Sequence, residues 1–215
     1  MDEPSVLSPS STVTWLRQRF ASGDNAVGHA TVIEPGLPPL ELQQLQPLTP
    51  AAVLVPLVVR KTGITVLLTQ RTIHLKDHAG QISFPGGSCD AEDNSPIEAA
   101  LREAQEEVGL DPAQIEVLGC LPEYCTITGF AITPVVALVQ PPLNLKLNDI
   151  EVAEAFETPL DFLLAPNNHQ RHEIEFQGVL RSYYAMHWQG YYIWGATAGM
   201  LVSLHRFLFP QHPQS

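Results

Sequence analysis

The sequence contains few positively charged residues. Its 215 residues include 11 Lys and Arg against 23 Asp and Glu, which gives a formal net charge of −12. Proteins that bind nucleic acid are usually basic, because their surface must neutralise phosphates. We therefore expect no nucleic-acid partner. A small anionic ligand is still compatible with this charge if a local cation reverses the field around it.

Cysteine and long apolar runs are also scarce. The three cysteines form no C-x-x-C pair, and their odd number offers no disulfide framework. This pattern favours a reducing compartment, so we expect a cytoplasmic protein. The longest nearly unbroken apolar runs, at 51–59 and within 195–209, are shorter than the roughly 20 residues that span a bilayer. We therefore expect no membrane partner.

The composition that remains is typical of a folded domain. Hydrophobic residues make up 45% of the chain and charged residues 16%, the opposite of the balance in disordered proteins. Strands are predicted at 51–59, 64–70, 81–84, 115–121, 132–139, 172–176, 182–187 and 191–194, and helices at 12–21, 97–108, 159–164 and 197–209. The Lys61-Thr62-Gly63 turn predicts a hairpin between the first two strands. Ser10 or Ser11 is expected to cap the first helix, and Ser95 and Pro96 to begin the second, which Gly109 ends. Because strands and helices do not alternate regularly, an α+β sandwich is favoured over a Rossmann sheet. The predicted boundaries are a helix and Pro-rich arm over 1–46, a main domain over 47–210 and a short tail over 211–215.

The helix predicted at 97–108 carries an unusual set of carboxylates. Glu103, Glu106 and Glu107 are spaced i, i+3 and i+4, so they share one face beside the apolar stripe. Like charges at this spacing destabilise a helix, and a divalent cation with its preference for oxygen ligands would remove the repulsion. Arg102 falls between Glu98 and Glu106 on the helical wheel, where it can orient and partly neutralise them. Taken alone, the helix is explained at least as well by an ordinary solvated acidic face.

The residues around these carboxylates resemble a known motif. Residues 102–110 read Arg-Glu-Ala-Gln-Glu-Glu-Val-Gly-Leu, which is similar to the core of the Nudix box, R-E-U-x-E-E-x-G-U. The resemblance implies a Nudix-type α/β/α sandwich with a mixed sheet, and a 47–210 domain that hydrolyses nucleoside diphosphates linked to another group. It also implies Mg²⁺ or Mn²⁺ held by Glu103 and Glu107, with Glu106 as a further ligand or a partner of the attacking water. Upstream, Gly87 and Asp93 each lie one residue earlier than the general pattern has its Gly and Glu.

A second stretch, from Leu67 to Gly87, resembles the signature of the coenzyme A pyrophosphatase branch of Nudix proteins. Asp90 and Asp93 match the aspartates that follow that signature, and Lys76 stands where the branch usually has Arg. The resemblance implies hydrolysis of coenzyme A, acyl-CoA or CoA disulfide to 3′,5′-ADP and 4′-phosphopantetheine or its derivative. The alternatives are a Nudix hydrolase of another nucleoside diphosphate derivative, such as ADP-ribose, and a non-catalytic nucleotide-binding Nudix domain.

The same signature supplies the residues expected to bind the small-molecule substrate. The basic side chains are candidates for phosphate contacts, including a contact to the 3′-phosphate of CoA, and the glycines let the backbone approach a ligand. The substrate-binding candidates are Arg71, Lys76, Gly80, Gln81, Phe84, Gly86 and Gly87.

The general base is left open by the sequence. Glu106 is one candidate, and Glu151 and Glu154 are others, because Nudix enzymes often take a base or an extra ligand from a later loop. An exposed acidic segment explains Glu151 and Glu154 equally well. The catalytic candidates are therefore Glu106, Arg102 as the orienting cation, and Glu151. Nudix proteins are often dimers, so a homodimer is one alternative for the assembly.

Overall fold

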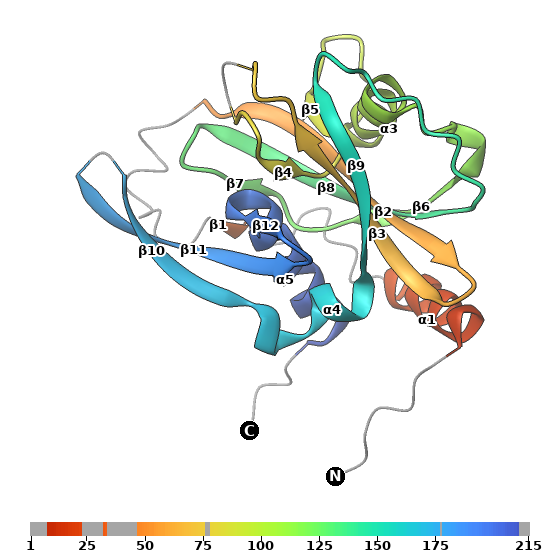
Figure 1. Ribbon diagram of the computed structural model, residues 1–215. Helices are drawn as coiled ribbons and strands as arrows, with labels where there is room; N and C mark the ends of the chain where they lie inside the picture. The colour runs from red at the N-terminus through yellow and green to blue at the C-terminus, as the bar shows by residue number, and fades with distance from the viewer. Residues whose placement is uncertain (1–7, 23–31, 34–46, 76–77, 177, 211–215) are drawn as a thin grey trace.

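The computed structural model describes residues 8–22, 32–33, 47–75, 78–176 and 178–210 (Figure 1). The expected phosphate contact at Lys76, the tail over 211–215 and most of the Pro-rich arm lie outside these residues. The division of the chain at residue 46 stays a prediction.

A parallel pair of strands forms the centre of a large mixed sheet. Strand β2 (Thr49–Arg60) pairs in parallel with β8 (Phe130–Val139) over ten residues, from Thr49 opposite Phe130 to Val58 opposite Val139. Strand β3 (Gly63–Arg71) returns antiparallel to β2 through a tight turn at Lys61 and Thr62, so the predicted hairpin is confirmed. These runs are rich in β-branched residues, which suit a buried sheet.

Shorter strands complete this sheet. Within the described residues it has nine strands, with the path β1-β7-β8-β2-β3-β4 and side pairings of β5 with β2, β6 with β8 and β9 with β3. The additional strands are β1 (Val32–Ile33), β4 (Ile82–Ser83), β5 (Gly86–Ser88), β6 (Ile115–Cys120), β7 (Tyr124–Cys125) and β9 (Val152–Pro159). The sequence pattern did not predict β9, because its apolar and polar residues do not alternate regularly, and only Val152 and Thr158 of its eight residues are buried.

Helices cover both faces of the large sheet (Figure 1). Helix α3 (Pro96–Val108) packs its alanines and Val108 on one face, against side chains such as Leu54, Leu67 and Val135. Helices α1 (Pro9–Ala21), α4 (Leu160–Leu164) and α5 (Gly195–Leu208) pack on the other face, against side chains such as Leu57 and Leu68. The alternation of β2 and β3 residues between two cores confirms the expected mixed α/β/α sandwich.

The start of α1 differs from the expectation that Ser10 or Ser11 caps it. Ser8 is the N-cap, and its hydroxyl accepts a hydrogen bond from the Ser11 amide at 3.3 Å. Pro9 takes the first helical position, where its missing N–H costs nothing and its fixed φ suits the helix, so the helix begins earlier than the periodicity indicated.

A second sheet of three antiparallel strands lies beside the sandwich (Figure 1). It contains β10 (Gln170–Phe176), β11 (Val179–Trp188) and β12 (Tyr191–Trp194), and short 3₁₀ turns occur at Pro112–Gln114 and Pro166–Asn168. Its inner face, which includes Met186 and Ile193, joins the core under α5. Of the helices in the described ranges, none has both the length and the apolar character to cross a membrane.

Candidate active site

Helix α3 is fixed at both ends by local sequence. The Ser95 hydroxyl accepts from the Glu98 amide at 3.2 Å, Pro96 follows in the first turn, and Gly109 ends the helix with a φ of 70°. The expected contact of Arg102 with Glu98 is absent from the described contacts. Glu98 instead accepts from the Asn94 side chain at 2.7 Å, because a glutamate in the first turn can fold back over the helix N-terminus.

The Gly86-Gly87 backbone lies directly against the carboxylates of α3. Gly86 has a φ of 155°, and a Cβ there would come within 2.6 Å of the Val53 Cα on β2. The Gly86 amide donates to Glu107 Oε2 at 3.2 Å. A Cβ on Gly87 would lie 2.6 Å from Glu103 Oε1. Only glycine lets this loop approach both carboxylates so closely.

Glu107 is the most deeply buried of the acidic residues on α3. Its side chain is 4% exposed, and its Oε1 lies 3.8 Å from Arg71 Nη1, at the end of β3. The pKa of Glu107 is raised to about 7, mainly by burial; the charges of Glu103 and Glu151 contribute to this rise, and the Gly86 amide and Arg71 oppose it. In this environment the ionised form of the carboxylate is stabilised by any positive charge placed next to it.

Arg102 holds the other carboxylates together. Its guanidinium contacts Asp93 Oδ2 at 3.0 Å, Glu103 Oε1 at 2.9 Å and Glu106 Oε2 at 3.3 Å. Burial raises the pKa of Glu103, and Arg102 acts against that rise. The hydrogen bond from Arg102 also lowers the pKa of Asp93. The predicted orienting role for Arg102 next to Glu106 is thus matched by direct contacts, and its strongest partner, Asp93, was not predicted.

Two loops bring Glu151 to the same place. Its charge contributes to the raised pKa of both Glu103 and Glu107, so its carboxylate is near enough to act on them. The Asn148 side chain donates to Glu151 Oε1 at 3.1 Å, and the Thr72 amide donates to the Glu151 carbonyl at 2.9 Å. No sequence pattern indicated these supporting roles of Asn148 and Thr72, because Asn and Thr are common in turns.

Glu154 has a different environment. It lies on β9 opposite Gln70, and its carboxylate accepts a hydrogen bond from the Tyr191 hydroxyl at 2.7 Å. The Tyr191 ring stacks on Phe156 with a centroid separation of 3.7 Å. Since Glu154 already has this partner, the geometry favours Glu151 as the acidic residue that a later segment adds to the site.

The remaining signature residues shape the adjoining loop. The Gly80 carbonyl accepts from the Gln70 side chain at 3.3 Å, and Gln81 Oε1 lies 2.9 Å from His78 Nδ1. Phe84 is 2% exposed and belongs to the core. Its side chain therefore supports the loop from below, rather than facing the solvent side where a substrate would bind.

The donor atoms near Gly86 and Gly87 are of the kind that Mg²⁺ and Mn²⁺ prefer, namely carboxylate oxygens. Within the described ranges, no three His, Cys, Asp or Glu side chains converge closely enough to form a metal-binding group. Burial raises the pKa of both Glu103 and Glu107, and the charge of Glu103 adds to the rise at Glu107, so a cation would stabilise both ionised carboxylates. Glu106 is turned toward Arg102 and its side chain is 59% exposed. The chemistry of the donors thus fits a divalent ion, and the metal site with Glu103, Glu106 and Glu107 stays a prediction.

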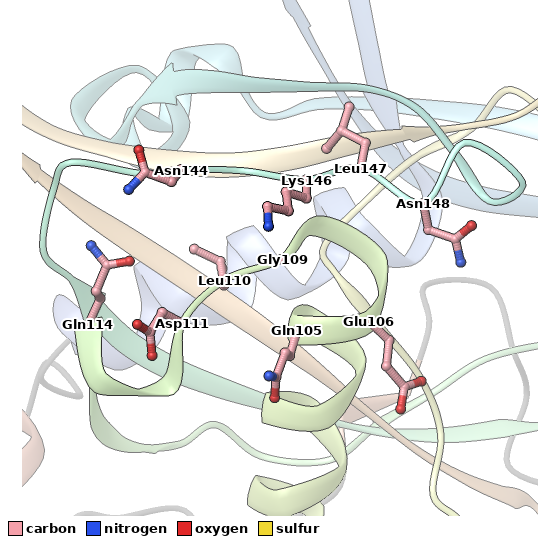
Figure 2. Close-up of a pocket in the computed structure, with 10 residues that line it drawn as sticks. All are labelled: Gln105, Glu106, Gly109, Leu110, Asp111, Gln114, Asn144, Lys146, Leu147 and Asn148. Carbon is pink, nitrogen blue, oxygen red and sulfur yellow. The ribbon is translucent and has the colours of Figure 1, made fainter.

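A hollow of about 730 Å³ opens beside the C-terminal end of α3 (Figure 2). It lies between the end of the helix and the segment that carries Asn144, Lys146 and Asn148. Of the predicted site residues, Glu106 alone lines it. The hollow is therefore adjacent to the carboxylate cluster but separate from it, and we do not place the reacting phosphates there.

Comparison with known proteins identifies the family. A family described as "NUDIX domain" matches residues 48–176. The chain is 44% identical over 154 residues to a protein of Citrobacter koseri named "Uncharacterized Nudix hydrolase NudL", covering 72% of this chain and 80% of that protein. A protein of the same name from Salmonella dublin is 40% identical over 181 residues, covering 84% and 92%.

Solved structures with a similar fold include Nudix hydrolases. The Nudix hydrolase RenU from M. smegmatis matches with 30% identity and a TM-score of 0.46 over 53% of this chain and 71% of that chain. An Ap4A hydrolase from C. elegans matches with 22% identity and a TM-score of 0.45 over 52% and 80%. On the family match and the curated relatives, the chain belongs to the Nudix hydrolase family.

Proposed function

We propose that the protein hydrolyses the pyrophosphate of coenzyme A and its derivatives to 3′,5′-ADP and 4′-phosphopantetheine or its derivative. The observation that carries the proposal is the position of Arg71, which ends the strand of the CoA-pyrophosphatase-like signature. Its Nε is buried and has no hydrogen-bond partner among the described residues, and its Nη1 lies 3.8 Å from Glu107. An unsatisfied buried donor costs about 1–3 kcal/mol, which a phosphate oxygen would recover.

The main task of this site is to neutralise charge on an anionic substrate. Glu103 and Glu107, with Glu106, would hold Mg²⁺ or Mn²⁺, which when bound supplies electrostatic shielding of the phosphates and a lower pKa for a coordinated water. Arg71 binds a phosphate oxygen. Gly86 and Gly87 have no side chains, so they leave the space next to the carboxylates open to the substrate. Arg102 keeps Glu103 in place through its hydrogen bond.

Glu151 is proposed as the general base. Its carboxylate accepts the proton of the attacking water while Asn148 fixes its orientation at 3.1 Å. Its location beside Glu103 and Glu107 supports this role over that of Glu154, whose carboxylate is engaged by Tyr191. The three cysteines are free thiols, which suits the reducing cytoplasm in which we propose that the reaction takes place.

The decisive experiment is a substrate panel with product identification. Purified protein is incubated with CoA, dephospho-CoA, ADP-ribose and NADH, with Mg²⁺ or Mn²⁺, in H₂¹⁸O, and the products are identified by mass spectrometry. We expect CoA to be preferred and ¹⁸O to appear in one product phosphate. A clear preference for ADP-ribose would reject CoA as the substrate, and nucleotide binding without turnover would identify a non-catalytic domain.

The role of Arg71 is tested separately. Arg71→Ala is expected to lower the hydrolysis of CoA more than that of dephospho-CoA, because we propose that Arg71 contacts the 3′-phosphate. Arg17→Ala is the matched control, since Arg17 pairs with Glu116 on an exposed surface. Equal losses on the two substrates would remove the 3′-phosphate contact from the proposal.

A further inference from the structure

Two aliphatic side chains near the candidate active site are unusually exposed. Ile73 is 76% exposed and Ile150 is 73% exposed, the highest values among the exposed large hydrophobic residues of the described chain. Single exposed aliphatic residues are common on protein surfaces. Here, however, two of them come from segments that meet in space.

Hydrogen bonds join the two segments that carry these isoleucines. The Thr72 hydroxyl donates to the Ile150 carbonyl at 2.8 Å, and the Thr72 amide donates to the Glu151 carbonyl at 2.9 Å. Ile150 is thus hydrogen-bonded to Thr72, and Ile73 is the residue that follows Thr72 in the chain. Continuing the antiparallel register of Arg71 with Val152 places Ile73 opposite Ile150, and residues opposite each other on neighbouring strands share one face.

The same two segments carry the polar groups of the proposed reaction. Arg71 lies two residues before Ile73 and pairs with Val152 across the strands, and Glu151 follows Ile150 directly. A molecule that contacts both isoleucines would therefore lie close to Arg71 and Glu151 in the fold. This favours a substrate that joins a pyrophosphate to an aliphatic chain over a separate protein that would cover the reacting groups.

We propose that Ile73 and Ile150 form an apolar rim that binds the aliphatic part of the substrate beyond the pyrophosphate, namely the pantetheine arm and an attached acyl chain. This inference rests on the proposed function. Contact with an alkyl chain removes apolar surface of both partners from water, which is favourable in proportion to the area covered. Longer acyl chains should therefore be better substrates, up to the length of the rim.

The test compares chain-length dependence in three proteins. We measure kcat/KM for CoA, butanoyl-CoA and octanoyl-CoA with the wild type, with Ile73→Ser/Ile150→Ser, and with Ile174→Ser as control. Ile174 is also exposed, at 44%, but lies on β10 in the other sheet. Complete burial of a methylene is worth about fourfold in binding, so partial contact predicts a gain of roughly five- to tenfold from butanoyl to octanoyl. The gain should persist in Ile174→Ser and fall below about twofold in the double variant.

The outcomes separate this proposal from the proposed function. Equal chain-length dependence in the wild type and the double variant rejects the rim, even if CoA is hydrolysed. If no CoA ester is hydrolysed, calorimetric binding of CoA and octanoyl-CoA gives an independent reading. Tighter octanoyl-CoA binding that the double variant loses supports the rim, and equal affinities reject it. Loss of a dimer in the double variant, measured by light scattering with unchanged kinetics, would show that the rim is an interface between subunits.

Discussion

Replacing Glu107 by Gln should stabilise the metal-free protein at alkaline pH while it removes activity. The Glu107 carboxylate is 4% exposed, and its pKa rises from an ordinary 4.5 to about 7. One pKa unit corresponds to about 1.4 kcal/mol, so ionising this group in the folded state costs about 3 kcal/mol. Gln cannot ionise, and its side-chain oxygen can still accept from the Gly86 amide.

The direction with pH follows from linkage. The folded protein binds the Glu107 proton more tightly than the unfolded chain, so the contribution of Glu107 to stability is greatest below pH 4.5 and is lost as the pH rises through about 7. The wild type and Glu107→Gln should therefore unfold at similar urea concentrations at pH 4.5. At pH 8 the variant should be more stable by about 2–3 kcal/mol, or by roughly 5–10 °C in Tm for a chain of this size.

The assay is urea and thermal unfolding of EDTA-treated protein at pH 4.5 and pH 8. Glu106→Gln is the matched control, because Glu106 is exposed and should show little difference between the two pH values. Added Mg²⁺ should stabilise the wild type at pH 8 more than Glu107→Gln. The reasoning is refuted if Glu107→Gln has no stability gain at pH 8, or if the same gain appears at pH 4.5.

Three further predictions concern the loop and the general base. Gly86→Ala should prevent stable folding, because its Cβ would meet the β2 backbone, which cannot move away. Gly87→Ala should fold but lose about 10- to 100-fold in kcat/KM, because its Cβ would displace the Glu103 carboxylate, whose flexible end can give way. Glu151→Gln should lower kcat by about 10²–10⁴-fold, whereas Glu154→Gln should stay within about twofold of the wild type.

Circular dichroism and kinetic measurements check these outcomes. A soluble Gly86→Ala protein that unfolds cooperatively would show that the loop can accommodate a Cβ next to the β2 backbone, contrary to the prediction. Wild-type activity in Gly87→Ala would show that the loop does not control the position of the Glu103 carboxylate. If Glu154→Gln lost more activity than Glu151→Gln, the assignment of the base would be reversed.

Local patterns predicted the elements that depend on neighbouring residues. Ser95 and Pro96 indicated the start of α3 and Gly109 its end, because capping involves residues within one turn. The β2–β3 hairpin followed from two β-branched runs around a short turn. The start of α1 was placed too late, because the apolar periodicity says nothing about Ser8 and Pro9.

Contacts between distant segments were beyond such patterns. Arg102 was expected to contact Glu98, four residues away, but it binds Asp93, whose approach depends on how the preceding loop folds onto the helix. The strand β9 was missed because its pairing with β3 is decided by the sheet and not by its own alternation. Phe84 was predicted to bind substrate from its place in the motif, whereas packing under the sheet places it in the core.

Residue type and short-range spacing were enough to indicate the family, the carboxylate-bearing helix and the scarcity of positive charge. The three-dimensional fold was needed to show which acidic residues share an environment. It brought Glu151 from a distant loop to Glu103 and Glu107, and it paired Glu154 with Tyr191. It also placed the partly exposed Arg71 side chain 3.8 Å from Glu107 and joined the segments that carry Ile73 and Ile150. These choices depend on how β3 and β9 pair, which brings together residues about 80 positions apart in the chain and therefore leaves no short-range trace in the sequence.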